Sequence, residues 1–126
     1  MVCPKQLCYT KGHQWLSFEE GYAFIGITDF AQKELGPIVL VEILHLSKTV
    51  KQEGFLGIVE ADKSVLDLFM PVTGIISEIN QNMMKYPRLI NKAPYEIWLV
   101  KVWVLSIYNP PLLTADEYKT FIGYAK

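Results

Sequence analysis

Residues 56–70 of the chain read LGIVEADKSVLDLFM, and this stretch decides the fold. Leu56–Glu60 and Leu66–Met70 are rich in aliphatic and aromatic residues, which is typical of two strands. The residues between them, Ala61–Ser64, are short and mostly polar and therefore predict a tight turn. Lys63 lies near the tip of this turn. The stretch predicts a β-hairpin with a lysine at its end.

Similar strand-like segments lie on both sides of the hairpin. They are rich in β-branched and aromatic residues, and glycine, proline and acidic residues separate them. They comprise Gln14–Ser17, Tyr22–Ile27 and Ile38–Leu44 before the hairpin, and Gly74–Ile79 and Ile97–Leu105 after it. Short strands at this spacing predict an antiparallel sandwich or flattened barrel rather than βαβ units.

Short helices are predicted between some of these strands. Asp29 is expected to cap the first, with Gln32 three residues further on. Gly36 stands where a left-handed residue would end this helix. A further helical turn is expected around residues 81–86, where Pro87 limits its length. These helices are too short to form a layer of their own.

The C-terminal region predicts one more helix. Thr114 and Glu117 form a capping-box pattern, and an apolar stripe follows before Gly123. The predicted fold is therefore mainly β, with small flanking helices that include a C-terminal one.

The chain has 126 residues, with 12 basic and 13 acidic side chains and a net charge of −1. This length suits a single domain, which we place at residues 9–126, after a short N-terminal arm of residues 1–8. The balanced charge offers no field for nucleic acid or for an anionic membrane. Because no apolar run approaches the roughly 20 residues of a spanning helix, and the arm lacks a secretion signal, we expect a cytoplasmic protein.

Other residues with reactive side chains are expected to be structural. Cys3 and Cys8 cannot form a zinc site by themselves, and His13 and His45 have no metal-ligand spacing, so we predict free thiols and no metal. No nucleophile lies near His13 in the sequence, and no catalytic residue is predicted. The tryptophans are expected to anchor the core, namely Trp15, Trp98 and Trp103.

Lys63 is the candidate functional residue. A hairpin tip is exposed and its two strands fix its position, so a modifying enzyme can reach the amine. Acylation would remove the charge without disturbing the core. A lysine in a β-turn is also, and more commonly, an ordinary solvated side chain. The turn by itself leaves both interpretations open.

The residues around Lys63 narrow the choice. Residues 60–64 read EADKS, with Pro71 eight and Gly74 eleven positions after the lysine. This pattern resembles the attachment hairpin of lipoyl domains. Biotin carriers normally have a methionine on each side of the lysine, where this chain has aspartate and serine. Phosphopantetheine carriers use a serine at a helix start, whereas Ser64 lies in a predicted hairpin. Lipoate on Lys63 is therefore the favoured modification.

The flanking segments resemble one kind of lipoyl protein. Residues 9–16 read YTKGHQWL and residues 26–39 read GITDFAQKELGPIV. Both are similar to segments of the glycine cleavage system H proteins, and the likeness continues through residues 87–91 and 94–99. It covers nearly the whole chain, from Tyr9 to Tyr124. The lipoyl domain of a 2-oxoacid dehydrogenase acyltransferase is shorter and lacks these flanks.

The resemblance implies a barrel-sandwich hybrid fold, a lipoylated Lys63 and no catalysis by the chain itself. It implies a carrier that shuttles the aminomethyl intermediate of glycine cleavage among glycine decarboxylase, aminomethyltransferase and dihydrolipoyl dehydrogenase. A lipoate ligase or lipoyltransferase would attach the arm. Glu60 matches a family position three residues before the lysine, and it is interpreted either as a contact for that enzyme or as a plain surface carboxylate.

A few positions depart from the family pattern. Asp62 stands before the lysine where H proteins usually have valine. An aspartate at this position resembles the pattern of the acyltransferase lipoyl domains. Gly12 and Gln14 stand where the family has a serine and a glutamate. In the family, that serine and that glutamate help to hold the loaded arm, together with an aspartate that Asp67 matches. A glutamate forms a charge-assisted hydrogen bond to a cationic intermediate, and such a bond is roughly twice as strong as the neutral bond that Gln14 can form. We therefore predict that this protein protects a cationic intermediate less well than the family does.

These departures leave two other functions open. An H-like protein would serve a lipoylation relay, as acceptor or donor of lipoyl groups for 2-oxoacid dehydrogenase subunits, and Asp62 favours such a diverged role. A binding module that has kept the fold and lost the arm is disfavoured, because Lys63 and Glu60 are both present. Glycine cleavage is the leading prediction.

Overall fold

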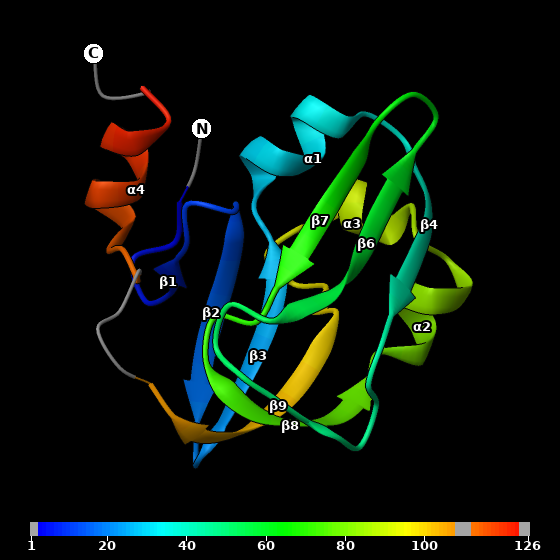
Figure 1. Ribbon diagram of the computed structural model, residues 1–126. Helices are drawn as coiled ribbons and strands as arrows, with labels where there is room; N and C mark the ends of the chain where they lie inside the picture. The colour runs from blue at the N-terminus through cyan, green and yellow to red at the C-terminus, as the bar shows by residue number, and fades with distance from the viewer. Residues whose placement is uncertain (1–2, 108–111, 124–126) are drawn as a thin grey trace.

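The computed structural model describes residues 3–107 and 112–123, and Figure 1 shows the arrangement of its strands and helices. The strands are β1 (Cys8–Tyr9), β2 (Gln14–Glu19), β3 (Tyr22–Ile27), β4 (Ile38–Ile43), β5 (Thr49–Val50), β6 (Phe55–Ala61), β7 (Val65–Phe69), β8 (Thr73–Ile79) and β9 (Val100–Ser106). The helices are α1 (Asp29–Leu35), α2 (Gln81–Lys85), α3 (Leu89–Lys92) and α4 (Ala115–Phe121). The predicted mainly β class is confirmed.

The strands form two antiparallel sheets. One sheet has the order β1-β2-β3-β9-β8-β5, and the other has the order β4-β6-β7. In Figure 1 the hairpin of β6 and β7 lies in front of the upper end of β3, and β4 runs along the right side of the hairpin. The predicted antiparallel sandwich is confirmed, and the predicted hairpin supplies two of the three strands in the smaller sheet.

The main core lies between the two sheets. In β3 the side chains of Ala23, Ile25 and Ile27 are buried, which follows the alternation of a strand with one face covered. Val59 and Leu68, from the hairpin strands β6 and β7, belong to the same buried cluster. Because this shared burial removes apolar surface of both sheets from water, it holds the hairpin against the larger sheet.

The predicted cap of α1 at Asp29 is wrong by one residue. Thr28 caps the helix with an extended backbone (φ −77°, ψ 163°), and its hydroxyl accepts a hydrogen bond from the Ala31 N–H at 3.2 Å. Asp29 is the first helical residue, where its carboxylate accepts from Gln32 and pairs with Lys33 at 3.0 Å. Threonine and aspartate are both good caps, and the backbone conformation decides between them.

The other predicted helix ends follow their sequence signals. Gly36 has the expected positive φ of 79°, although its ψ of −159° lies outside the left-handed helical region. The capping box of α4 is confirmed: the Glu117 N–H donates to Thr114 Oγ1 at 3.1 Å, and the Thr114 N–H donates to Glu117 Oε1 at 2.9 Å.

The chain after β8 forms two helical turns. Helix α2 occupies most of the predicted turn at residues 81–86. Helix α3 was not predicted; it follows Pro87, whose carbonyl accepts from the Ile90 N–H at 3.1 Å. Pro87 precedes the N-cap residue Arg88, so its missing N–H removes no hydrogen bond within the helix. None of the helices in the described ranges is long and apolar enough to cross a membrane.

A second apolar cluster joins residues 3–9 and helix α4 to β2. Cys3 and Leu7, from the predicted N-terminal arm, pack there with Tyr9, Trp15 and Tyr118. The rings of Tyr9 and Tyr118 stack with their centroids 5.0 Å apart, which connects α4 to β1. Both cysteines are free thiols. The larger sheet is therefore covered on part of its outer face as well.

One of the three tryptophans does not anchor the core. Trp15 is buried and Trp98 packs against the second cluster, as predicted. Trp103 is 42% exposed, so the prediction for it is wrong. Its ring packs edge-on against Tyr22 at 4.9 Å and lies over Gly21, where an added Cβ would be 2.9 Å from the ring. Trp103 covers the β2–β3 turn from outside instead of filling the interior.

Candidate functional site

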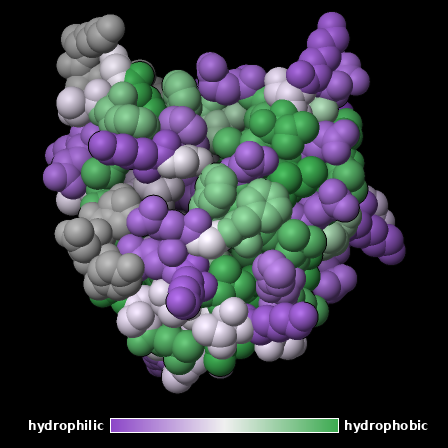
Figure 2. Space-filling view, in the orientation of Figure 1, coloured by the Kyte–Doolittle hydropathy of each residue, from purple (hydrophilic) through white to green (hydrophobic). Residues whose placement is uncertain are grey.

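Lys63 lies at the end of the hairpin formed by β6 and β7. The Ala61 N–H donates to the Ser64 carbonyl at 2.8 Å, which closes the turn, and Asp62, Lys63 and Ser64 are exposed. The tip is at the upper right of Figure 1, and Figure 2 shows a hydrophilic projection at the same corner. Among the described residues, Lys63 has no ion-pair partner. The predicted hairpin is confirmed, and solvent reaches the amine.

The backbone beneath Lys63 is held from both sides. Strand β6 is the central strand of its sheet and pairs with β4 and β7. Val59 and Leu68 are fully buried beneath the hairpin. Gly57 lets β4 approach closely, because an added Cβ would lie 2.0 Å from the Glu42 carbonyl oxygen. The lysine backbone is therefore fixed while its side chain is free.

The predicted carboxylates lie on the outer face of this hairpin. Asp67 is directly opposite Ile58, and Glu60 is two residues further along the same strand as Ile58. Side chains opposite one another, or two residues apart on one strand, share a face. Glu60 is half-buried and Asp67 is exposed, and Asp62 lies at the exposed tip beside Lys63. Glu60 and Asp67 therefore share the outer face of the hairpin, and Asp62 is next to the lysine at the tip.

A hollow of about 260 Å³ lies beside the tip. It is bounded by α1, the turn before β2 and the start of β7; the lining residues are His13, Phe30, Ala31, Glu34, Leu35, Ser64, Val65 and Leu66. Because Ser64 follows Lys63 directly, the hollow begins next to the lysine. In the described chain β7 pairs with β6 and has no strand partner on its other edge, where the Gln14 side chain hydrogen-bonds to Phe69. The hollow lies beside the Ser64–Leu66 end of that edge.

His13 connects this hollow to the C-terminal helix. Its Nδ1 lies 2.8 Å from the Tyr118 hydroxyl, which is also 2.7 Å from Thr28 Oγ1. The His13 ring packs against Phe30 with centroids 5.0 Å apart. Burial lowers the pKa of His13, and the nearby Glu34 carboxylate opposes this lowering. These contacts agree with the structural role expected for His13.

A second hollow, of about 370 Å³, lies further along β7. Gly12 and Gln14 line it together with Phe69, whereas Asp67 is not among its lining residues. Gln14 is 2% exposed; its Nε2 donates to the Phe69 carbonyl at 2.8 Å, and its Oε1 accepts from the Phe69 N–H at 3.0 Å. The structure thus brings Gly12 and Gln14 together, leaves Asp67 outside their hollow, and gives the Gln14 amide two backbone partners.

Gln14→Glu is expected to destabilise the protein by about 1–3 kcal/mol at neutral pH. A carboxylate can accept from the Phe69 N–H but cannot donate to the Phe69 carbonyl, and the site is buried. The deficit should shrink in acid, because a protonated carboxyl regains a donor. Urea unfolding at several pH values measures this, with the exposed Gln6→Glu as control. An equal effect of both substitutions would contradict the proposed role of the Gln14 amide.

Sequence reasoning missed the hollow beside the tip. Phe30 and Leu35 give α1 an apolar side, which signals that the helix packs but not that it packs near β7. It also missed Phe69 as the partner of Gln14, for which the sequence carries no signal. Within residues 3–107 and 112–123, no group of three or more His, Cys, Asp or Glu side chains is placed to hold a metal ion.

Comparisons with known proteins agree on one family. The family model "Glycine cleavage H-protein" matches residues 7–123. The glycine cleavage system H protein of Staphylococcus carnosus is 40% identical over 125 residues, which cover 98% of this chain and 99% of that protein. The crystal structure of a glycine cleavage system H protein from Mycobacterium marinum matches with a TM-score of 0.88 and 33% identity, covering 96% of this chain and 99% of the other.

The comparisons cover both the hairpin and its flanks. The family match spans every strand and helix described above, from β1 to α4. Members of this family are non-catalytic lipoyl carrier subunits of the glycine cleavage system. The chain belongs to the glycine cleavage H-protein family.

Proposed function

We propose that Lys63 carries a covalently bound lipoyl group and that the protein is a carrier subunit in glycine cleavage. The observation that carries this proposal is the exposed amine on a turn that β6 and β7 hold in place. A modifying enzyme must reach the amine, and partner enzymes must find it in a constant position. Lipoate attached there would supply a dithiol–disulfide couple at the end of a long flexible chain.

The residues beside the tip fit such a group. Phe30, Leu35 and Leu66 give the adjacent hollow apolar surface, which suits a hydrocarbon chain. Acylation removes the charge of Lys63, so the modified side chain would bring no ammonium into this hollow. The second hollow, beside Phe69, is six residues along the chain from Lys63, or roughly 20 Å at about 3.3 Å per strand residue. Both hollows lie along β7, and we propose that the arm rests against this strand between visits to partners.

The outer-face carboxylates are proposed to guide the partner enzymes. Glu60, Asp62 and Asp67 lie on the hairpin that carries Lys63 and form no ion pair among the described residues. Negative charge around the arm favours encounter with a basic surface, and it acts mainly on the association rate. The proposed partners are glycine decarboxylase, aminomethyltransferase and dihydrolipoyl dehydrogenase, with a lipoate ligase or lipoyltransferase as the modifying enzyme.

A lipoylation relay is the second candidate function. Two observations favour it: Asp62 is exposed directly beside Lys63, and the Gln14 amide is engaged by Phe69 rather than available to a cargo amine. In this function the chain would pass its lipoyl group to 2-oxoacid dehydrogenase subunits. It needs the same lysine and the same exposed tip, so the attachment site does not distinguish the two functions.

Glycine–bicarbonate exchange distinguishes them. Lipoylated protein is mixed with a glycine decarboxylase, and incorporation of labelled bicarbonate into glycine is measured. The exchange is expected to depend on the lipoylated form and to saturate with its concentration, with unmodified protein as the control. Absence of exchange, together with lipoyl transfer to a 2-oxoacid dehydrogenase domain when a lipoyltransferase is added, would contradict the first function and support the relay.

A further inference from the structure

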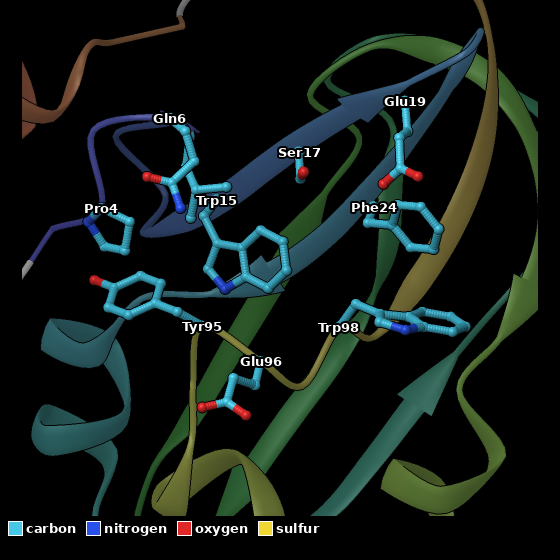
Figure 3. Close-up of a pocket in the computed structure, with 10 residues that line it drawn as sticks. Pro4, Gln6, Trp15, Ser17, Glu19, Phe24, Tyr95, Glu96 and Trp98 are labelled. Atoms are coloured by element: carbon cyan, nitrogen blue, oxygen red, sulfur yellow. The ribbon is translucent and has the colours of Figure 1, made fainter.

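We propose that a groove on the outer face of the six-stranded sheet binds an arginine side chain of a partner protein. The groove has a volume of about 340 Å³. Its lining includes four aromatic side chains and two carboxylates, which Figure 3 shows together: Trp15, Phe24, Tyr95, Trp98, Glu19 and Glu96. It is separate from the hairpin sheet that carries Lys63.

The aromatic surface is built by specific contacts. Trp15 lies directly over Gly26 of the neighbouring strand, where an added Cβ would be 2.4 Å from the indole. The Trp15 Nε1–H donates to the Pro94 carbonyl at 2.9 Å, so the indole is held in place; it is 3% exposed and forms the floor beneath the half-buried rings of Phe24, Tyr95 and Trp98. Phe24 and Trp98 pack edge to face with centroids 5.3 Å apart. The rings are therefore fixed before any ligand arrives.

The chain already places one cation near a ring of the groove, Phe24, and near Tyr22 beside it. Lys101 Nζ lies 4.3 Å from the Tyr22 ring centroid and 5.6 Å from that of Phe24. Such distances are those of cation–π attraction, in which the ring face attracts positive charge. Lys101 is not among the residues that line the groove, so the half-buried rings of Tyr95 and Trp98 are left for another cation.

The two carboxylates give the groove a charge that complements a cation. Glu19 and Glu96 are exposed and lie on opposite sides of the aromatic rings in Figure 3. Neither forms an ion pair within the described part of the chain. A groove of fixed rings between two unpaired carboxylates is suited to an organic cation rather than to a neutral ligand.

Among organic cations in proteins, arginine matches best. Its planar guanidinium can stack on an aromatic ring and donate hydrogen bonds to carboxylates at its edge, and its hydration is weaker than that of an ammonium. Because the groove and Lys63 belong to different sheets, a partner bound through arginine would leave the hairpin tip free. The groove would therefore serve as an anchor that does not compete with the arm.

Fluorine NMR of protein labelled with 5-fluorotryptophan tests the proposal. The probes are the capped peptide Gly-Arg-Gly and the same peptide with neutral citrulline in place of arginine. The Trp15 and Trp98 signals are expected to shift saturably with the arginine peptide, with a dissociation constant on the order of millimolar. Trp103, which lies outside the groove, is the internal reference. No shift, or an equal shift with the citrulline peptide, would overturn the proposal.

A matched pair of double variants localises the effect. Glu19→Gln with Glu96→Gln is expected to weaken binding of the arginine peptide about three- to tenfold, because two ion pairs at an exposed site are lost. Glu42→Gln with Glu78→Gln removes the same charge from exposed positions elsewhere and is expected to leave the affinity unchanged. Equal weakening by both doubles would show general charge attraction and would overturn the assignment to the groove.

Discussion

Lys63→Arg is expected to abolish lipoylation completely. The substitution keeps a positive charge at the tip but removes the amine that would form the amide, since a guanidinium stays protonated at neutral pH. Lys63 is exposed and without an ion pair in the described residues, so stability should change by less than about 0.5 kcal/mol. Intact mass after co-expression with a lipoate ligase and lipoate measures the effect: the parent chain gains one lipoyl group and the variant gains none.

Lys48→Arg provides the matched control for this experiment. Lys48 is also exposed, and it lies in the connection just before β5. This variant is expected to keep the full gain in mass. A lipoyl group on the Lys63→Arg protein, or an unmodified parent chain under the same conditions, would be incompatible with Lys63 as the attachment site.

Gly57→Ala is expected to cost about 3 kcal/mol or more of stability. The added Cβ would lie 2.0 Å from the Glu42 carbonyl oxygen and 3.1 Å from the Ile43 Cα, both backbone atoms of β4. A backbone cannot move aside as a flexible side chain can, so β4 must separate from β6 and lose ladder hydrogen bonds. Thermal unfolding is expected to show a melting temperature lower by about 10 °C.

Gly12→Ala tests whether the effect of Gly57→Ala comes from this close approach. A Cβ at Gly12 would meet Thr10 Oγ1 at 3.6 Å and Gln14 Oε1 at 3.8 Å, which are ordinary contacts. This variant is expected to stay within about 0.5 kcal/mol of the parent protein. If Gly57→Ala melted at the same temperature as Gly12→Ala, the proposed close packing of β4 on β6 would be refuted.

The sequence by itself determines the hairpin, the position of its lysine and most of the secondary structure. The two strands around Ala61–Ser64 and the turn between them depend on residues adjacent in the chain, and such signals are local. The capping box of Thr114 and Glu117 is local in the same sense, because its two members are three residues apart. These features could be predicted without knowledge of any distant contact. The family resemblance then pointed to the chemistry expected at Lys63.

The tertiary structure decides which side chains share the site. Gln14 and Phe69 are 55 positions apart, yet both hydrogen bonds of the Gln14 amide go to that one residue. Thr28, rather than Asp29, caps α1 and contacts Tyr118, 90 positions away. Local patterns encode which face of a strand or helix is buried, but not which neighbour it meets. That neighbour is set when the two sheets pack, because hydrogen bonds between distant segments require distances and angles that only the assembled sandwich provides.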